Sequence, residues 1–167
     1  MKIAIAISAV ISTGALLTAC GSSSTTGSET FSGSTTSTAN KPVVPLKASG
    51  VFTDTGSITL GGQSTKGTLT FSKGNLDLTH SKGSNSNTPT SFNPSTCRVV
   101  FESLGTFKVT GGTGSYKGAT GHGTFKVEFA ASLPKLANGK CNESNNAQPI
   151  AGSSLTTFKA TGTLTIT

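Results

Sequence analysis

The chain has 167 residues, which is enough for one domain of ordinary size and a few appendages. Only 11% of the residues are charged, and glycine, serine and threonine dominate while helix formers are sparse, which argues against a helical protein. Apolar residues are concentrated in a leading run and in alternating segments, so the composition does not indicate disorder throughout. The formal net charge of +7 identifies no partner by itself.

Residues 1–19 are predicted to be a signal peptide. Met1-Lys2 is a short basic start, and the apolar run from Ile3 to Leu17 has the length that signal peptides use but is short for a membrane span. The next residues, Leu17-Thr18-Ala19-Cys20-Gly21, resemble the lipobox of bacterial lipoproteins. The resemblance implies cleavage before Cys20, thioether diacylation of its thiol and acylation of the new amino terminus, which together give lasting attachment to membrane lipid. We therefore expect an exported protein anchored to the outer face of a bacterial membrane, with an ordinary secretory signal as the alternative.

Residues 20–42 are predicted to be a flexible linker behind the lipidated cysteine. From Gly21 to Thr38 the segment is serine, threonine and glycine, with Glu29 and Phe31 as exceptions, and it shows no periodicity. Such a segment has too little apolar surface to pack against a core. We expect it to be disordered and to hold the folded domain clear of the membrane.

The folded domain is predicted to span residues 43–167 and to consist of antiparallel strands. Its side chains alternate between apolar and polar at period two, as in half-buried strands. The alternating segments cover residues 46–52, 58–60, 69–71, 76–80, 97–103, 105–109, 123–129 and 158–167. This makes seven or eight strands, depending on whether Gly105 is a bulge inside one strand or a turn between two.

The first and last of these strands are alike, because Leu46-Lys-Ala-Ser-Gly is echoed by Phe158-Lys-Ala-Thr-Gly. Pairing between them would close a barrel and remove the exposed sheet edges. We therefore expect an all-β fold, a closed antiparallel barrel of about eight strands, with a β-sandwich as the alternative.

A repeated pentapeptide, Gly-Thr-Phe-Lys-Val, at Gly105–Val109 and Gly123–Val127 predicts two antiparallel strands joined by a tight, glycine-dense connection. That connection contains GGTGSYKGATG, Gly111–Gly121, which resembles the GGTG-x-aromatic-x-G-A-x-G signature of the allene oxide cyclase and dirigent barrels. The resemblance implies an eight-stranded antiparallel barrel in which this segment joins adjacent strands and the aromatic Tyr116 is tucked in. It assigns no site residues, because the catalytic and ligand-orienting polar residues of the plant members have no counterpart that we can place in this chain.

Cys97 and Cys141 are the cysteines that remain once Cys20 is lipidated. In an exported protein, two such cysteines are expected to form a disulfide. A metal site or a nucleophilic thiol is the alternative, but neither cysteine has a suitable partner nearby in the sequence.

Two further residues are candidates for ligand binding. His80 follows Leu76 and Leu78 at period two, so we expect it on the inward face at the end of a strand, either contacting a ligand, acting as a base or satisfied at the rim. Tyr116 is expected to cover the end of the core, with an exposed ligand contact as the alternative. The sequence contains no recognisable catalytic set or metal cluster, and we predict no cofactor. A single arginine and inward-facing phenylalanines argue against nucleic-acid binding.

These observations leave three hypotheses for the function. The first is a non-enzymatic, lipid-anchored barrel that serves as a binding or structural module. The second is a barrel that encloses one small apolar ligand. The third is a cyclase or isomerase, which only the resemblance to the plant enzymes implies. A filled interior would favour the first, an apolar void the second, and an interior with two or three convergent polar groups the third. The oligomeric state is left open.

Overall fold

The computed structural model describes residues 23–61, 64–81, 83, 88–144 and 146–167. The predicted signal peptide and Cys20 therefore lie outside the described residues. Within the described part, no helix is long and apolar enough to cross a membrane. The described residues form strands β1 (Thr25–Thr35), β2 (Val43–Gly50), β3 (Asp54–Thr59), β4 (Lys66–Phe71), β5 (Gly74–His80), β6 (Ser91–Asn93), β7 (Arg98–Gly112), β8 (Thr120–Ser132) and β9 (Leu155–Ile166), and one short 3-10 turn, η1 (Gly114–Tyr116).

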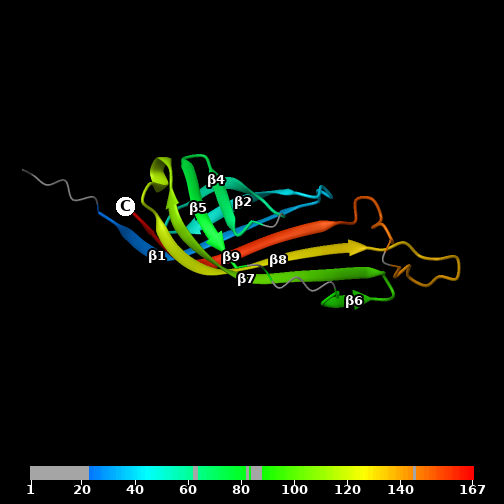
Figure 1. Cartoon of the computed structure of the whole chain (residues 1–167). Helices are drawn as coiled ribbons and strands as arrows, with labels where there is room; N and C mark the ends of the chain where they lie inside the picture. The colour runs from blue at the N-terminus through cyan, green and yellow to red at the C-terminus, as the bar shows by residue number, and fades with distance from the viewer. Residues whose placement is uncertain (1–22, 62–63, 82, 84–87, 145) are drawn as a thin grey trace, which may run out of the picture.

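Eight of these strands close into an antiparallel barrel. The sheet runs in the order β5-β4-β3-β2-β1-β9-β8-β7-β6, and pairing between β5 and β7 joins its two sides. Strand β6 pairs with the outer part of β7 and lies outside the closed circuit. In Figure 1, β7, β8 and β9 run side by side well past the body of the barrel, with β6 at the far end. The predicted all-β closed barrel is confirmed.

The structure corrects the predicted extent of the linker, because Thr25–Thr35 form β1. This strand lies between β2 and β9 and pairs with β9 along its whole length. Its inward side chains Glu29 and Phe31 are buried, while serines and threonines cover the outer face. Backbone pairing on both sides compensates for the small apolar surface of β1, so a polar composition does not prevent it from being a central strand.

The predicted pairing of the first and last alternating segments is also corrected. Strand β1 separates β2 from β9, and the barrel closes instead between β5 and β7, with a register shift between Asp77 and Leu78. Gly105 lies inside one continuous strand, β7, that pairs with β8 from Arg98 to Val109. The expected number of about eight strands is right, although its members differ: β1 is added and the two segments around Gly105 merge.

The core is filled by aromatic rings at the end of the barrel that carries η1. The ring of Tyr116 lies 4.6 Å from that of Phe52 and 5.8 Å from that of Phe71, measured between centroids. Phe31 continues this cluster, 6.0 Å from Phe71. These buried rings therefore occupy the interior at this end of the barrel.

The predicted disulfide between Cys97 and Cys141 is present, with a sulfur–sulfur distance of 2.06 Å. It joins the residue before β7 to the long connection between β8 and β9. The bond therefore fastens the extended end of the sheet, away from the aromatic cluster.

Candidate functional site: a cavity at the open end of the barrel

The end of the barrel opposite η1 contains a cavity of about 320 Å³. This volume lies in the range of small-molecule sites in proteins, about 300–1,000 Å³. Most of the lining is apolar and comes from both sides of the barrel. The apolar side chains are those of Phe31, Ile58, Leu60, Leu69, Leu78, Phe107, Phe125, Val127, Phe158 and Ala160.

Small residues on the lining keep this end of the barrel hollow. Gly67 on β4 and Ala160 on β9 both line the cavity and present little or no side chain to it. A Cβ atom placed on Gly67 would lie 3.2 Å from a methyl carbon of Leu78 and 3.9 Å from the ring of His80. The backbone of Gly67 is not in the left-handed region, so a larger side chain fits the strand there and would project into the cavity.

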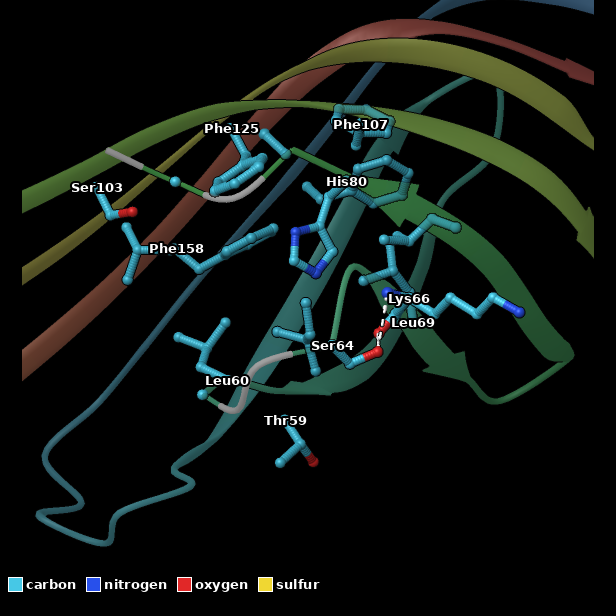
Figure 2. Close-up of a pocket in the computed structure, with 18 residues that line it drawn as sticks. Thr59, Leu60, Ser64, Lys66, Leu69, His80, Ser103, Phe107, Phe125 and Phe158 are labelled. Atoms are coloured by element: carbon cyan, nitrogen blue, oxygen red, sulfur yellow. Dashed lines mark hydrogen bonds between the residues drawn. The ribbon is translucent and has the colours of Figure 1, made fainter. Parts of the chain in front are cut away.

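His80 is the titratable ring on the cavity lining. It stands at the end of β5 on the face that also carries the buried Leu76 and Leu78, as the period-two pattern predicts. Its ring meets that of Phe125 edge-on, with 5.8 Å between centroids. Figure 2 shows the ring inside the cavity, between Phe158 and Leu69.

The hydrogen bond of His80 determines which nitrogen faces a ligand. Nδ1 lies 2.8 Å from the carbonyl oxygen of Ser81. A carbonyl can only accept, so Nδ1 carries the proton and Nε2 of the neutral ring is left as an acceptor. Among the described residues Nε2 has no protein partner. The ring can therefore accept a hydrogen bond from a ligand or, if protonated, donate one.

The other polar residues at the mouth of the cavity present fewer free hydrogen-bonding groups to its interior. Ser64 is engaged locally: its hydroxyl donates to the carbonyl of Lys66 at 3.1 Å and accepts from the Lys66 amide at 3.0 Å. The side chain of Lys66 extends away from the cavity (Figure 2). Ser103 and Thr59 complete the polar part of the rim. No group of three or more potential metal ligands occurs among the described residues.

Tyr116, the other predicted ligand contact, is not among the residues that line this cavity; it lies in the aromatic cluster and is only 2% exposed. Its hydroxyl donates a hydrogen bond of 2.7 Å to Oδ2 of Asp54. Burial, together with this bond to a carboxylate, raises the pKa of Tyr116 above its ordinary value. The structure does not bring Tyr116 and His80 together, and it gives Tyr116 the surroundings of a core residue.

Asp54 is a buried carboxylate whose role the sequence did not identify. Oδ1 accepts hydrogen bonds from the Ser72 hydroxyl at 2.6 Å and the Thr55 amide at 2.7 Å, and Oδ2 accepts from Tyr116 and from the Lys73 amide at 3.2 Å. These hydrogen bonds lower the pKa of Asp54 to about 2, and the bond from the Ser72 hydroxyl has the largest effect. Asp54 ties β3 to the turn before β5 and to η1. Asp54 stands two residues after Phe52, and this spacing places both on the inward face; it was the sequence signal that could have identified Asp54 as a buried carboxylate.

Glu29 is a second buried carboxylate, and it falls in the segment that was predicted to be a linker. It is 2% exposed, and its Oε2 accepts the amide hydrogen of Phe52 at 3.1 Å. Oε1 has no partner among the described residues, and burial raises the pKa of this carboxyl. Glu29 and Phe31 stand two residues apart in a run of serine, threonine and glycine, which was the signal of a strand.

No protein-family model and no curated protein matches this chain. Among solved structures, the chain is similar to the pterocarpan synthase dirigent protein GePTS1 at 13% sequence identity, over 84% of each chain, with a TM-score of 0.25. The likeness concerns the fold alone.

Proposed function

We propose that this protein binds one small, mostly apolar molecule inside the open end of its barrel. The observation that carries the proposal is the cavity of about 320 Å³ with its largely apolar lining. A purely structural module would gain stability from filling this space, because empty apolar volume in a core costs free energy. The residues at Gly67 and Ala160 instead keep it open.

The position of His80 supports a ligand with one polar group that can donate a hydrogen bond, such as a hydroxyl. Nε2 of the half-buried neutral ring lacks a protein partner among the described residues, and pairing this acceptor with a ligand's donor would be favourable. The aromatic rings of Phe125 and Phe158 nearby offer broad contact surfaces to the rest of such a molecule.

The proposal is a binding function rather than a catalytic one. An isomerase or cyclase acts through an acid and a base, or through a base and a charge-stabilising group, that converge on one substrate. On the described lining, His80 provides one such group, while Ser64 is engaged with Lys66 and the Lys66 side chain extends away. One convergent group favours recognition over turnover.

The proposal includes attachment to the outer face of a bacterial membrane through lipid on Cys20, which the lipobox-like sequence supports. Strand β1 begins at Thr25, and Thr25 pairs with Ile166 at the end of the barrel that carries η1 (Figure 1). Residues 21–24 can span at most about 14 Å. An anchor this short holds the filled end of the barrel toward the lipid, so the mouth of the cavity faces away from the membrane.

Binding can be tested with the fluorescent apolar probe 1-N-phenylnaphthylamine. The mature chain from residue 20 with Cys20→Ser is suitable, because every strand and the whole core that the structure describes lie between Thr25 and Ile166. The protein has no tryptophan, so the probe's emission is measured without that background. We expect saturable enhancement with a stoichiometry of one.

Two variants locate the probe. Gly67→Leu should abolish the enhancement by filling the cavity, whereas Thr70→Leu, an exposed position on the same strand, should leave it unchanged. His80→Phe should preserve probe binding but weaken ligands with a hydroxyl group, and His122→Phe, at the exposed second histidine, is its control. Thermal melts check that each variant is folded. Equal probe binding by folded Gly67→Leu and the parent would refute the proposal.

A further inference from the structure

We infer that the ligand of this barrel is elongated, with its apolar part in the cavity and a neutral polar part in a groove that continues past the barrel's end. The inference rests on the proposed function and names the class of ligand: an uncharged, elongated amphiphile. It is carried by a second hollow beside the cavity and by a buried hydroxyl in that hollow.

The groove has a volume of about 560 Å³ and lies between the β1–β2 connection and the starting end of β9. Leu60 and Val127 line both the cavity and the groove, so the two spaces meet at these side chains. The opposite wall comes from residues 148–151. In Figure 1 the extended ends of β8 and β9 lie side by side in this part of the molecule.

One continuous face of β8 and β9 forms the floor of both spaces. The register pairs Phe125 with Ala160, Val127 with Phe158, and Phe129 with Thr156. Alternate residues of a strand share a face, so this face runs from Ala160 in the barrel to Ser154 in the groove, about 20 Å at the usual rise per residue. Along it the lining changes from apolar side chains to hydroxyl groups, which fits a molecule with an apolar and a polar end.

Ser154 is the observation that points to a bound group. The residue is 2% exposed and lines the groove. Its hydroxyl oxygen is buried and has no hydrogen-bond partner among the described residues. Buried hydroxyls in folded proteins are nearly always paired, because leaving one unpaired costs free energy. A rotation of the Ser154 side chain that turns its hydroxyl into the groove would let a polar atom of a ligand supply the missing partner.

The lining of the groove also indicates that the polar part is uncharged. It contains hydroxyls and the amides of Asn40 and Gln148, and none of its residues carries a charge. An ionic head group would lose its hydration here without gaining a counter-ion. Amides and hydroxyls are suited to alcohol, ester or amide groups.

The test uses glycerol monodecanoate, a neutral elongated amphiphile, below its micelle concentration, to displace 1-N-phenylnaphthylamine from the Cys20→Ser chain. Ser154→Ala should weaken its displacement constant about threefold to tenfold, as expected for the loss of one hydrogen bond. The direct affinity for the probe, which occupies only the cavity, should not change. Because the Ser154 hydroxyl has no protein partner among the described residues, the Tm of this variant should not fall. Ser34→Ala, on the exposed face of β1, is the matched control.

The outcomes separate this inference from the proposed function. If the probe binds and responds to Gly67→Leu, but Ser154→Ala binds glycerol monodecanoate as well as the parent, the hydroxyl is satisfied by water alone and the inference fails while the proposed function stands. Failure of glycerol monodecanoate to displace a bound probe also overturns the inference. If the probe does not bind the parent chain, the proposed function fails and the inference fails with it.

Discussion

Replacement of Tyr116 by alanine should remove a large share of the barrel's stability. The ring is 2% exposed and packs against Phe52 and Phe71 at the filled end. Loss of a buried aromatic side chain typically costs about 3–5 kcal/mol, a substantial part of the 5–15 kcal/mol by which domains are stable. For a protein of this size, we expect Tm to fall by about 10 °C or more.

Tyr116→Phe separates the contribution of the hydroxyl from that of the ring. It keeps the packing but removes the 2.7 Å hydrogen bond to Asp54. A hydrogen bond to a charged group contributes about 1.5–3 kcal/mol, so we expect an intermediate loss at neutral pH.

The effect of Tyr116→Phe should also depend on pH. The pKa of Asp54 is lowered from 3.8 to about 2, first by Ser72 and then by Tyr116. A carboxyl with a lowered folded pKa contributes stability that is fully present above its unfolded value and is lost as the pH falls through its folded value. The difference between wild type and Tyr116→Phe should therefore be largest above pH 4 and should narrow between pH 4 and pH 2.

Thermal and urea unfolding at pH 7 and pH 2.5 measure both effects. Lys117→Ala, at the exposed neighbour of Tyr116, is the control and should melt as the wild type does. A Tyr116→Ala protein with unchanged Tm would refute the structural interpretation. An unchanged Tm together with loss of probe binding in Tyr116→Ala would identify Tyr116 as a ligand contact instead.

Glu29→Gln should become progressively more stable than the wild type as the pH rises above 4.5. Burial raises the pKa of Glu29, so the wild type loses no stability while this carboxyl is protonated in both the folded and the unfolded state, and it loses more as the pH rises from 4.5 through the folded pKa. Urea unfolding from pH 4 to pH 8 measures the stability difference between the two proteins. A difference that does not change with pH would contradict the assigned burial. Replacing Cys97 and Cys141 together by serine should lower the free energy of unfolding by about 4 kcal/mol on the chain-entropy model for a separation of 44 residues; an unchanged urea midpoint would show that the bond is dispensable. Cys20→Ala should accumulate as an unlipidated precursor, whereas a wild-type mature protein whose intact mass corresponds to a bare amino terminus would exclude lipidation.

The repeated pentapeptide shows how far local sequence could predict this fold. In the antiparallel pairing of β7 with β8, Gly105 lies opposite Phe125 and Phe107 lies opposite Gly123. A Cβ atom on Gly105 would come within 2.5 Å of the Phe125 ring, and one on Gly123 within 2.8 Å of the Phe107 ring. Each aromatic ring therefore covers the glycine of the other copy. The alternation of side chains predicts the two strands. Why each strand has a glycine two residues before its phenylalanine becomes clear only from the register, which places each glycine under the other strand's ring.

Strand β1 carries only the spacing of Glu29 and Phe31 as a signal in its own residues, because its stability comes mainly from its two neighbours. Only Glu29 and Phe31 are large inward side chains in a segment otherwise made of serine, threonine and glycine. By composition alone, such a segment belongs with flexible linkers. In the closed barrel β1 lies between β2 and β9, and backbone pairing along both of its edges makes this polar strand part of the sheet.

The cavity was beyond sequence prediction for a related reason. His80 was expected on the inward face because a period-two pattern predicts which face a side chain occupies. Whether that face surrounds a filled or a hollow space depends on residues brought together from distant strands. At one end, Phe31, Phe52 and Tyr116 meet and fill the interior. At the other end Gly67 lies beside Leu78 and His80, and the volume that its missing side chain leaves forms part of the cavity in which the proposed ligand would meet the histidine.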